Sequence, residues 1–130
     1  MPDIILKKIR AGICVSISDN LKRGTIELML LTLLKEGDKY GYQLSQTLAE
    51  RSGGLFVVKE GSMYPTLYRL LNKGLISDRQ EKVGLRRTRV YYHLEQEGEE
   101  YLKEIMQEYI SLNRGIYKVL GYSNLEGTDS

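Results

Sequence analysis

The sequence predicts a mainly α-helical protein with a small β-hairpin, an α+β arrangement. Three features indicate this fold: two apolar helical segments, a short helix with a single apolar stripe, and a hairpin pattern followed by a long amphipathic helix. At 130 residues the chain has the length of one domain with an appendage. A core of that size is marginal, so association with a second copy would stabilise it.

Two helices are predicted before the short central helix. Segment 21–35 is apolar almost all round, which indicates burial on more than one side, and Gly37 follows it. Segment 40–51 ends at a Ser-Gly-Gly turn, and the apolar side chains expected on one face are Tyr42, Leu44, Leu48 and Ala49. The run 55–58 is apolar and partly β-branched, which predicts a short strand that could pair with the hairpin.

The central helix is predicted from Glu60 to Lys73, and Gly74 ends it. Pro65 must lie near the helix start because it has no N–H and its ring clashes with the preceding turn. The residues of the predicted buried stripe are Met63, Leu67, Leu70 and Leu71. The residues of the opposite side are Ser62, Thr66, Arg69 and Lys73. A short helix that offers hydroxyls and a guanidinium on its open face fits a DNA major groove.

A basic hairpin is predicted directly after this helix. Segments 75–80 and 90–94 read as strands, and the segment 82–94 contains four Lys or Arg residues and no acidic one. These four residues are Lys82, Arg86, Arg87 and Arg89. A short helix followed by a basic hairpin is the arrangement of a winged helix-turn-helix, in which the helix enters the major groove and the wing reaches the phosphates.

The last helix is predicted to mediate dimerisation. Its apolar positions recur in steps of three and four, which is typical of a packed seam. The seam residues are Leu102, Ile105, Met106, Tyr109, Leu112 and Ile116. A long amphipathic arm beyond a closed domain needs a partner, and a second copy is the simplest one.

The chain therefore divides into four parts. We expect an N-terminal extension at 1–20, a winged helix-turn-helix domain at 21–94, a dimerisation helix at 95–120 and a tail at 121–130. The tail is polar and contains glycine, so it is expected to fray.

Four short motifs in this order resemble the PadR family of bacterial transcriptional regulators. They are the segment 21–28, the pair Gly41-Tyr42, the run Glu60-Gly61-Ser62-Met63-Tyr64-Pro65-Thr66-Leu67 and the run Tyr91-Tyr92-His93-Leu94. The resemblance covers residues 21–120. Two departures stand out: the family usually places Thr after the Tyr-Tyr-x-Leu run, where this chain has Glu95, and residues 1–20 extend beyond the usual start.

The resemblance implies a homodimeric, cytoplasmic repressor that binds a near-palindromic operator in double-stranded DNA. Short-tailed members of the family dimerise through a single C-terminal helix. Aromatic or amphipathic compounds release DNA from several members, and some use a tryptophan of the last helix as a stacking surface. This chain has no Trp, and Tyr109, beside Met106, occupies about that position, so these two side chains are candidate ligand-binding residues.

The functional reading of each motif has a structural alternative. The polar side of the central helix could be an ordinary solvated face, and the wing arginines could simply increase solubility. Tyr64 could contact DNA or brace the helix start. The aromatic and methionine side chains of the last helix could be core alone. A winged helix without sequence-specific DNA binding, serving as a protein-interaction module, is the alternative function.

Other function classes find little support in the sequence. It contains no glycine-rich phosphate loop, no paired-histidine metal motif and no recognisable nucleophile–base set, so no enzyme, metal or cofactor is expected. His93, the single histidine, is expected to be structural. Cys14, the single cysteine, is expected to be a packed or partly exposed thiol in a reducing compartment. No apolar run approaches the roughly 18 residues of a membrane span.

Overall fold

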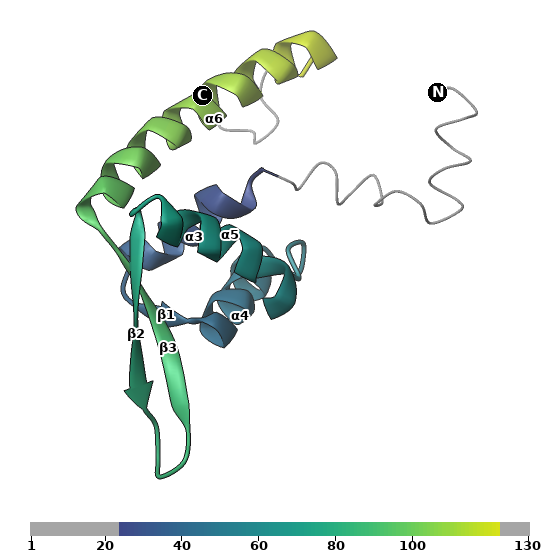
Figure 1. Cartoon of the computed structure of the whole chain (residues 1–130). Helices are drawn as coiled ribbons and strands as arrows, with labels where there is room; N and C mark the ends of the chain where they lie inside the picture. The colour runs from purple at the N-terminus through teal and green to yellow at the C-terminus, as the bar shows by residue number, and fades with distance from the viewer. Residues whose placement is uncertain (1–23, 123–130) are drawn as a thin grey trace, which may run out of the picture.

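The computed structural model of the chain describes residues 24–122. The elements are α3 (Ile26–Lys35), β1 (Lys39–Tyr40), α4 (Gly41–Arg51), α5 (Glu60–Asn72), β2 (Ile76–Lys82), β3 (Thr88–Leu94) and α6 (Gln96–Leu120). Helices α3, α4 and α5 form the body, the β2–β3 hairpin extends from one side of it, and α6 crosses the opposite side (Figure 1). The predicted fold, mainly helical with a small sheet and a long C-terminal helix, is confirmed.

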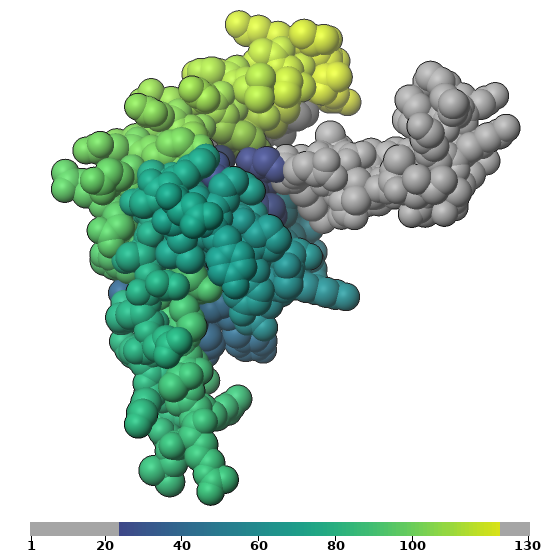
Figure 2. Space-filling model, in the orientation of Figure 1, coloured from purple at the N-terminus to yellow at the C-terminus, as the bar shows by residue number. Residues whose placement is uncertain are grey.

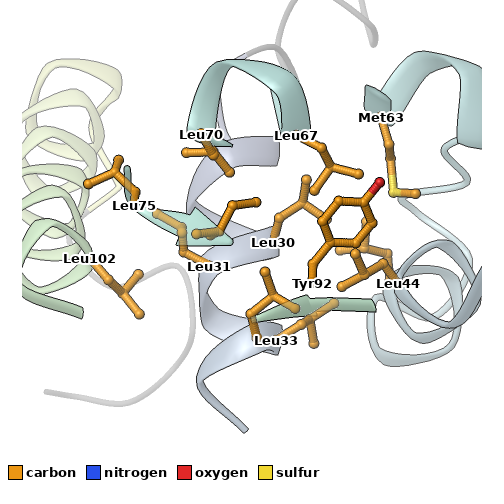
Figure 3. Close-up of a cluster of buried hydrophobic side chains, with 13 residues drawn as sticks. Leu30, Leu31, Leu33, Leu44, Met63, Leu67, Leu70, Leu75, Tyr92 and Leu102 are labelled. Carbon is orange, nitrogen blue, oxygen red and sulfur yellow. The ribbon is translucent and has the colours of Figure 1, made fainter. Parts of the chain in front are cut away.

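The core forms around α3. Leu30, Leu31, Leu33 and Leu34 are all buried, so this helix is covered on more than one side, as its composition predicted. Figure 3 shows side chains from α4, α5, β3 and α6 converging on it. The helix begins at Ile26, so the start predicted at residue 21 was too early for the described residues: Gly24 has a φ of +90° and lies with Thr25 in a turn.

The sheet has three antiparallel strands in the order β1-β3-β2. The predicted strand at 55–58 is wrong: this segment is a loop, with Leu55 60% and Val57 71% exposed. The third strand is instead β1, which pairs Lys39 with Tyr92 and Tyr40 with Tyr91. Since β1 already occupies that edge of β3 and β2 the other, neither edge is open to the run 55–58.

Helix α4 buries a narrower face than predicted. Leu44 and Leu48 are buried, but Tyr42 is 55% exposed, so its placement in the apolar face was wrong. Residues two positions apart in a helix are separated by about 200° around its axis, so Tyr42 lies on the side opposite Leu44. The two buried leucines suffice to seat α4 on the core.

Helix α5 is followed by a turn at Gly74 that leads into β2. Gly74, at a φ of +74°, adopts the left-handed conformation that follows many helix ends. The next residue, Leu75, donates its N–H to Leu70 O at 3.0 Å and accepts at its carbonyl from Glu95 N, also at 3.0 Å. Glu95 has no capping hydrogen bond from its side chain to α6; its Oε2 accepts a 2.6 Å bond from Ser77 Oγ. The carboxylate thus ties the start of α6 to β2.

Helix α6 has two parts with different surroundings. Leu102 is 3% exposed and belongs to the core of its own chain, and Ile105 packs against that core. From Met106 onward the apolar side chains are exposed, up to 87% at Val119. Figure 2 shows the far end of α6 and the hairpin projecting from the body. None of the described helices is both long and apolar enough to cross a membrane.

Candidate nucleic-acid interface

The exposed side of α5 has an aromatic flank beside the buried stripe. Met63, Leu67 and Leu70 are fully buried, which leaves Tyr64 and Tyr68 one residue further round the helix. These two rings stack with their centroids 6.2 Å apart, and they are 36% and 59% exposed. Tyr64 is thus partly exposed on the flank of α5, where it stacks on Tyr68.

A groove of about 370 Å³ joins this flank to the wing. Tyr64 and Tyr68 line its α5 side, and Thr88 and Arg89 line its β3 side. The Arg89 guanidinium lies 4.2 Å from the centroid of the Tyr40 ring, a cation–π contact that holds it at the base of the wing. Helix α5 and the wing therefore present one continuous face.

The polar flank of α5 is divided between solvent and the body. Ser62 is exposed and Thr66 is half-buried. Arg69 turns toward α3, with its Nε 3.8 Å from Glu27 Oε2, while its side chain stays 52% exposed. Lys73 Nζ lies 5.8 Å from the Tyr101 ring of α6. Ser62, Arg69 and Lys73 are thus the exposed polar positions of this flank, and Thr66 is only partly exposed.

Three of the four predicted wing cations lie at or next to the tip. The loop closes through a 2.9 Å bond from Val83 N to Arg87 O, and the side chains of Lys82, Arg86 and Arg87 are exposed. Arg89 lies in β3 opposite Glu81, one residue pair further from the tip than Lys82 and Thr88. Leu85, beside the two tip arginines, is 99% exposed. The tip therefore presents positive charge with one apolar side chain.

An ion-pair network braces the outer face of the sheet. Asp38 accepts from His93 Nδ1 at 2.8 Å and from Arg79 Nη1 at 2.5 Å, and Arg79 Nε donates to Glu81 at 2.7 Å. The hydrogen bond from His93, with further help from Arg79, holds the pKa of Asp38 below its usual value. His93 thus has the structural contact that its isolation in the sequence suggested.

The two neighbouring tyrosines of β3 point to opposite faces, as strand alternation requires. Tyr92 is 5% exposed in the core, where burial raises its pKa to about 12. Tyr91 meets Tyr40 edge-on at a centroid distance of 5.4 Å and lies under the Arg79 guanidinium. One tyrosine therefore anchors the hairpin in the body and the other supports its outer face.

The two candidate ligand-binding residues lie over a separate hollow. A cavity of about 380 Å³ opens between α3, α4, the following loop and α6. Its lining includes Met29, Leu48, Phe56, Met106 and Tyr109. Met106 and Tyr109 are thus brought together on a largely apolar recess within one chain.

Most of the predicted seam lies on the exposed part of α6. Met106, Tyr109, Leu112 and Ile116 are between 37% and 63% exposed. Leu102, in contrast, is enclosed by its own chain and offers no side-chain surface to a partner. The exposed seam therefore begins at Met106.

Sequence reasoning missed three residues: Tyr68 and Tyr40, which line the groove between α5 and the wing, and Arg79 in the network on the outer face of the sheet. The spacing of Tyr64 and Tyr68 at i and i+4 was a readable signal, because such residues are neighbours on a helix. Tyr40 and Arg79 acquire their roles only through the pairing of β1 and β2 with β3. Cys14 and the proposed extension at 1–20 lie outside the described residues, as does the tail beyond Tyr122.

Comparison with known proteins places the chain. The model of the transcriptional regulator PadR-like family matches residues 30–104. An uncharacterised protein X of Lysinibacillus sphaericus is 31% identical over 93 residues, which are 72% of this chain and 85% of that protein.

Solved structures agree. A transcriptional regulator from Clostridium thermocellum is 30% identical with a TM-score of 0.71, over 81% of this chain and 97% of that one. Bacillus subtilis PadR in complex with operator DNA is 26% identical with a TM-score of 0.59, over 65% of this chain and 48% of that one. The chain belongs to the PadR-like family of transcriptional regulators.

Proposed function

We propose that this regulator binds DNA sequence-specifically through α5 and the wing. The observation that carries the proposal is the groove in which Tyr64 and Tyr68 of α5 face Thr88 and Arg89 of β3. A helix in the major groove and a hairpin on the flanking backbone must share one face of the protein, and these two elements do. The operator complex of the Bacillus subtilis relative supports the same reading.

The chemistry of this face divides between positioning and reading. Lys82, Arg86 and Arg87 at the wing tip would neutralise phosphates, which supplies affinity without sequence information. Ser62 and Thr66 are short and polar, so at the start of α5 they could reach base edges. The ring of Tyr64 adds an apolar face that suits a thymine methyl group.

The proposed active form is a homodimer built on the exposed part of α6. Along this stretch Leu112, Ile116, Val119 and Leu120 are exposed. An exposed apolar stripe of this kind is unfavourable in water and typical of an interface. A two-fold pair would place two α5 helices over successive major grooves of a near-palindromic operator.

The proposed mode of regulation is repression relieved by a small aromatic or amphipathic ligand. The recess beside Met106 and Tyr109 has the size and largely apolar lining of small-molecule sites. It contacts α3, α4 and α6 together, so a ligand there could favour one arrangement of α6 against the body. Arg51, which lines the recess, pairs with Glu36 and would give the ligand a polar neighbour.

Selection of bound duplexes from a random pool tests the DNA proposal. The parent should enrich a near-palindromic sequence, and Ser62→Ala and Tyr64→Ala should each change the preferred bases at particular positions, at a cost of about 1–3 kcal/mol. Glu108→Ala, on the exposed face of α6, is the matched control and should keep the parent's preference. Failure of the parent to enrich any sequence would favour the protein-interaction alternative.

Calorimetric titration with a panel of planar aromatic compounds tests the ligand proposal. A compound that binds should release the selected operator, and Tyr109→Ala should weaken its binding more than it lowers stability, because stacking adds about 0.5–1.5 kcal/mol beyond area burial. Absence of heat from the whole panel, with operator binding intact, would argue for a purely structural seam.

A further inference from the structure

Three segments far apart in the sequence meet at the carboxylate of Glu27. Glu27 lies in the first turn of α3, and its side chain is only 17% exposed. Its Oε1 accepts a 2.9 Å hydrogen bond from the hydroxyl of Tyr101, on α6. Its Oε2 faces the Nε of Arg69, on α5, at 3.8 Å. The carboxylate thus stands between the C-terminal helix and the helix proposed to enter DNA.

Only one of the two oxygens of this carboxylate accepts a hydrogen bond from the described residues. Oε1 has the Tyr101 hydroxyl, whereas Oε2 is buried and has no hydrogen-bond partner among the described residues. A buried carboxylate oxygen that accepts no hydrogen bond lowers the stability of the fold, commonly by more than an unpaired neutral group does. The nearest cation to it is Arg69, and a small movement of that guanidinium would complete the bond.

Arg69 can serve two partners at once. A guanidinium carries five N–H donors in a planar fork, and only its Nε side faces Glu27. The side chain is 52% exposed, and neither terminal nitrogen has an ion pair with the described residues. Those nitrogens could donate to a phosphate while Nε stays beside the carboxylate.

Tyr101 fixes the carboxylate from the other side. The pKa of the Tyr101 hydroxyl is raised, first by burial and then by its hydrogen bond to Glu27, which agrees with a hydroxyl that keeps its proton and donates it to the carboxylate. Tyr101 also lies under the Lys73 ammonium, at 5.8 Å from Nζ to the ring centroid. Tyr101 of α6 is therefore linked to both basic residues at the end of α5: directly to Lys73, and through Glu27 to Arg69.

We infer that Glu27, oriented by Tyr101, is a positioning residue that holds Arg69 in place to contact a DNA phosphate. The inference rests on the proposed function and assigns to α6 a second role, since the helix of the dimer seam then also determines the geometry of a DNA-contacting residue. Met106 and Tyr109 lie within about two turns of Tyr101, so a ligand that shifted α6 would disturb the same contact.

Operator binding over a series of salt concentrations tests this inference in the full-length protein. Glu27→Gln keeps the shape of the side chain and an acceptor for Tyr101 but removes the charge. It should weaken binding about tenfold, the loss expected for one charge-assisted hydrogen bond. Arg69→Ala should weaken binding at least as much, and each variant should lower the log–log salt slope by about 0.9, one phosphate contact.

The double variant separates positioning from a general effect. Glu27→Gln in the Arg69→Ala background should cause no further loss of affinity or slope, because the residue it positions is gone. Glu104→Gln removes the same charge from an exposed position on α6, and it should leave the log–log salt slope unchanged. Tyr101→Phe should reproduce part of the Glu27→Gln loss. The Nε–Hε NMR signal of Arg69 should shift in Glu27→Gln and in Tyr101→Phe.

The outcomes are distinguishable. Equal losses from Glu27→Gln with and without Arg69, or tighter binding by Glu27→Gln, would overturn the inference and leave the proposed function standing. A parent that prefers no duplex sequence would overturn both. Melting temperatures of all variants identify any loss of binding that comes from unfolding.

Discussion

The α-carbon of Gly98 lies against the carbonyl of Leu75, so closely that a β-carbon at Gly98 would stand 2.1 Å from that oxygen. The same position would bring it 2.6 Å from Leu94 Cδ1. Leu75 O already accepts the N–H of Glu95, so the contact joins the end of α5 to the start of α6 through backbone on both sides.

Gly98→Ala should therefore destabilise the fold by about 3 kcal/mol, the upper end of the usual cost of overpacking, because backbone cannot yield as a side chain can. Chemical denaturation measures the loss. Gly61→Ala, in the first turn of α5, is the matched control, because an added β-carbon there meets nothing within 4 Å. It should be neutral or stabilising by up to about 1 kcal/mol.

Arg86→Ala combined with Arg87→Ala should weaken DNA binding for all sequences alike. Both side chains are exposed at the wing tip, where they would contact phosphates without reading bases. Each lost contact should lower the log–log salt slope by about 0.9. Titration at several salt concentrations decides the matter, and Arg114→Ala, an exposed arginine on α6, supplies the control. An unchanged slope in the wing variant would show that these arginines do not touch the backbone.

Acid should remove the contribution of the Asp38 network to stability. The pKa of Asp38 is lowered in the folded protein, first by the hydrogen bond from His93 and also by Arg79. A depressed carboxylate pKa stabilises the fold above the unfolded value of about 3.9, and this stabilisation disappears as the pH falls through the folded value.

Asp38→Asn should accordingly lower the melting temperature at pH 7, by the equivalent of about 1 kcal/mol for a partly exposed network. The difference from the parent should shrink as the pH is taken below about 4. Thermal melts of both proteins across this range provide the measurement. A difference that stayed constant into acid would mean that the charge of Asp38 contributes nothing to stability.

Leu112→Glu combined with Ile116→Glu should yield a folded monomer with weakened operator binding. Both side chains are exposed, at 63% and 43%, so the charges would oppose association without entering the core. Sedimentation and melting curves should show a smaller particle with an intact domain. Leu102→Ala provides the contrast: it should lower stability by about 2–5 kcal/mol, since its side chain lies in the core of its own chain. A dimer that survived both glutamates would place the interface elsewhere.

The sequence predicted those features that are encoded locally. The stripe of Met63, Leu67 and Leu70 defines α5 by its period, and the basic tip between two β-rich runs defines the wing. The third strand was misassigned because β1 has two residues and thus no period to detect. Its pairing depends on the edge that β3 offers, whereas the run at 55–58 has the right composition but finds both edges of β3 already paired.

Residue patterns in the sequence could not predict the side-chain networks between distant segments. Glu27 and Tyr101 are 74 positions apart, and nothing in either neighbourhood indicates that they bond. The same holds for Asp38 with His93 and Arg79, which meet only once β3 is paired on both edges. Leu102 belonged to the three-four seam by spacing, but tertiary packing assigned it to the body, because the first turns of α6 lie over the core.

Helix α6 is continuous over 25 residues, about 37 Å at 1.5 Å per residue. In the proposed dimer its first turns pack on the winged helix-turn-helix domain and its last turns on the partner. The length of the helix would then determine the distance between the two domains. One residue inserted between Gln107 and Ser111 would rotate each winged helix-turn-helix domain by about 100° relative to the dimer contact and shift it by about 1.5 Å along the helix. In the proposed dimer the length of α6 would thus set the operator spacing that the protein can bind.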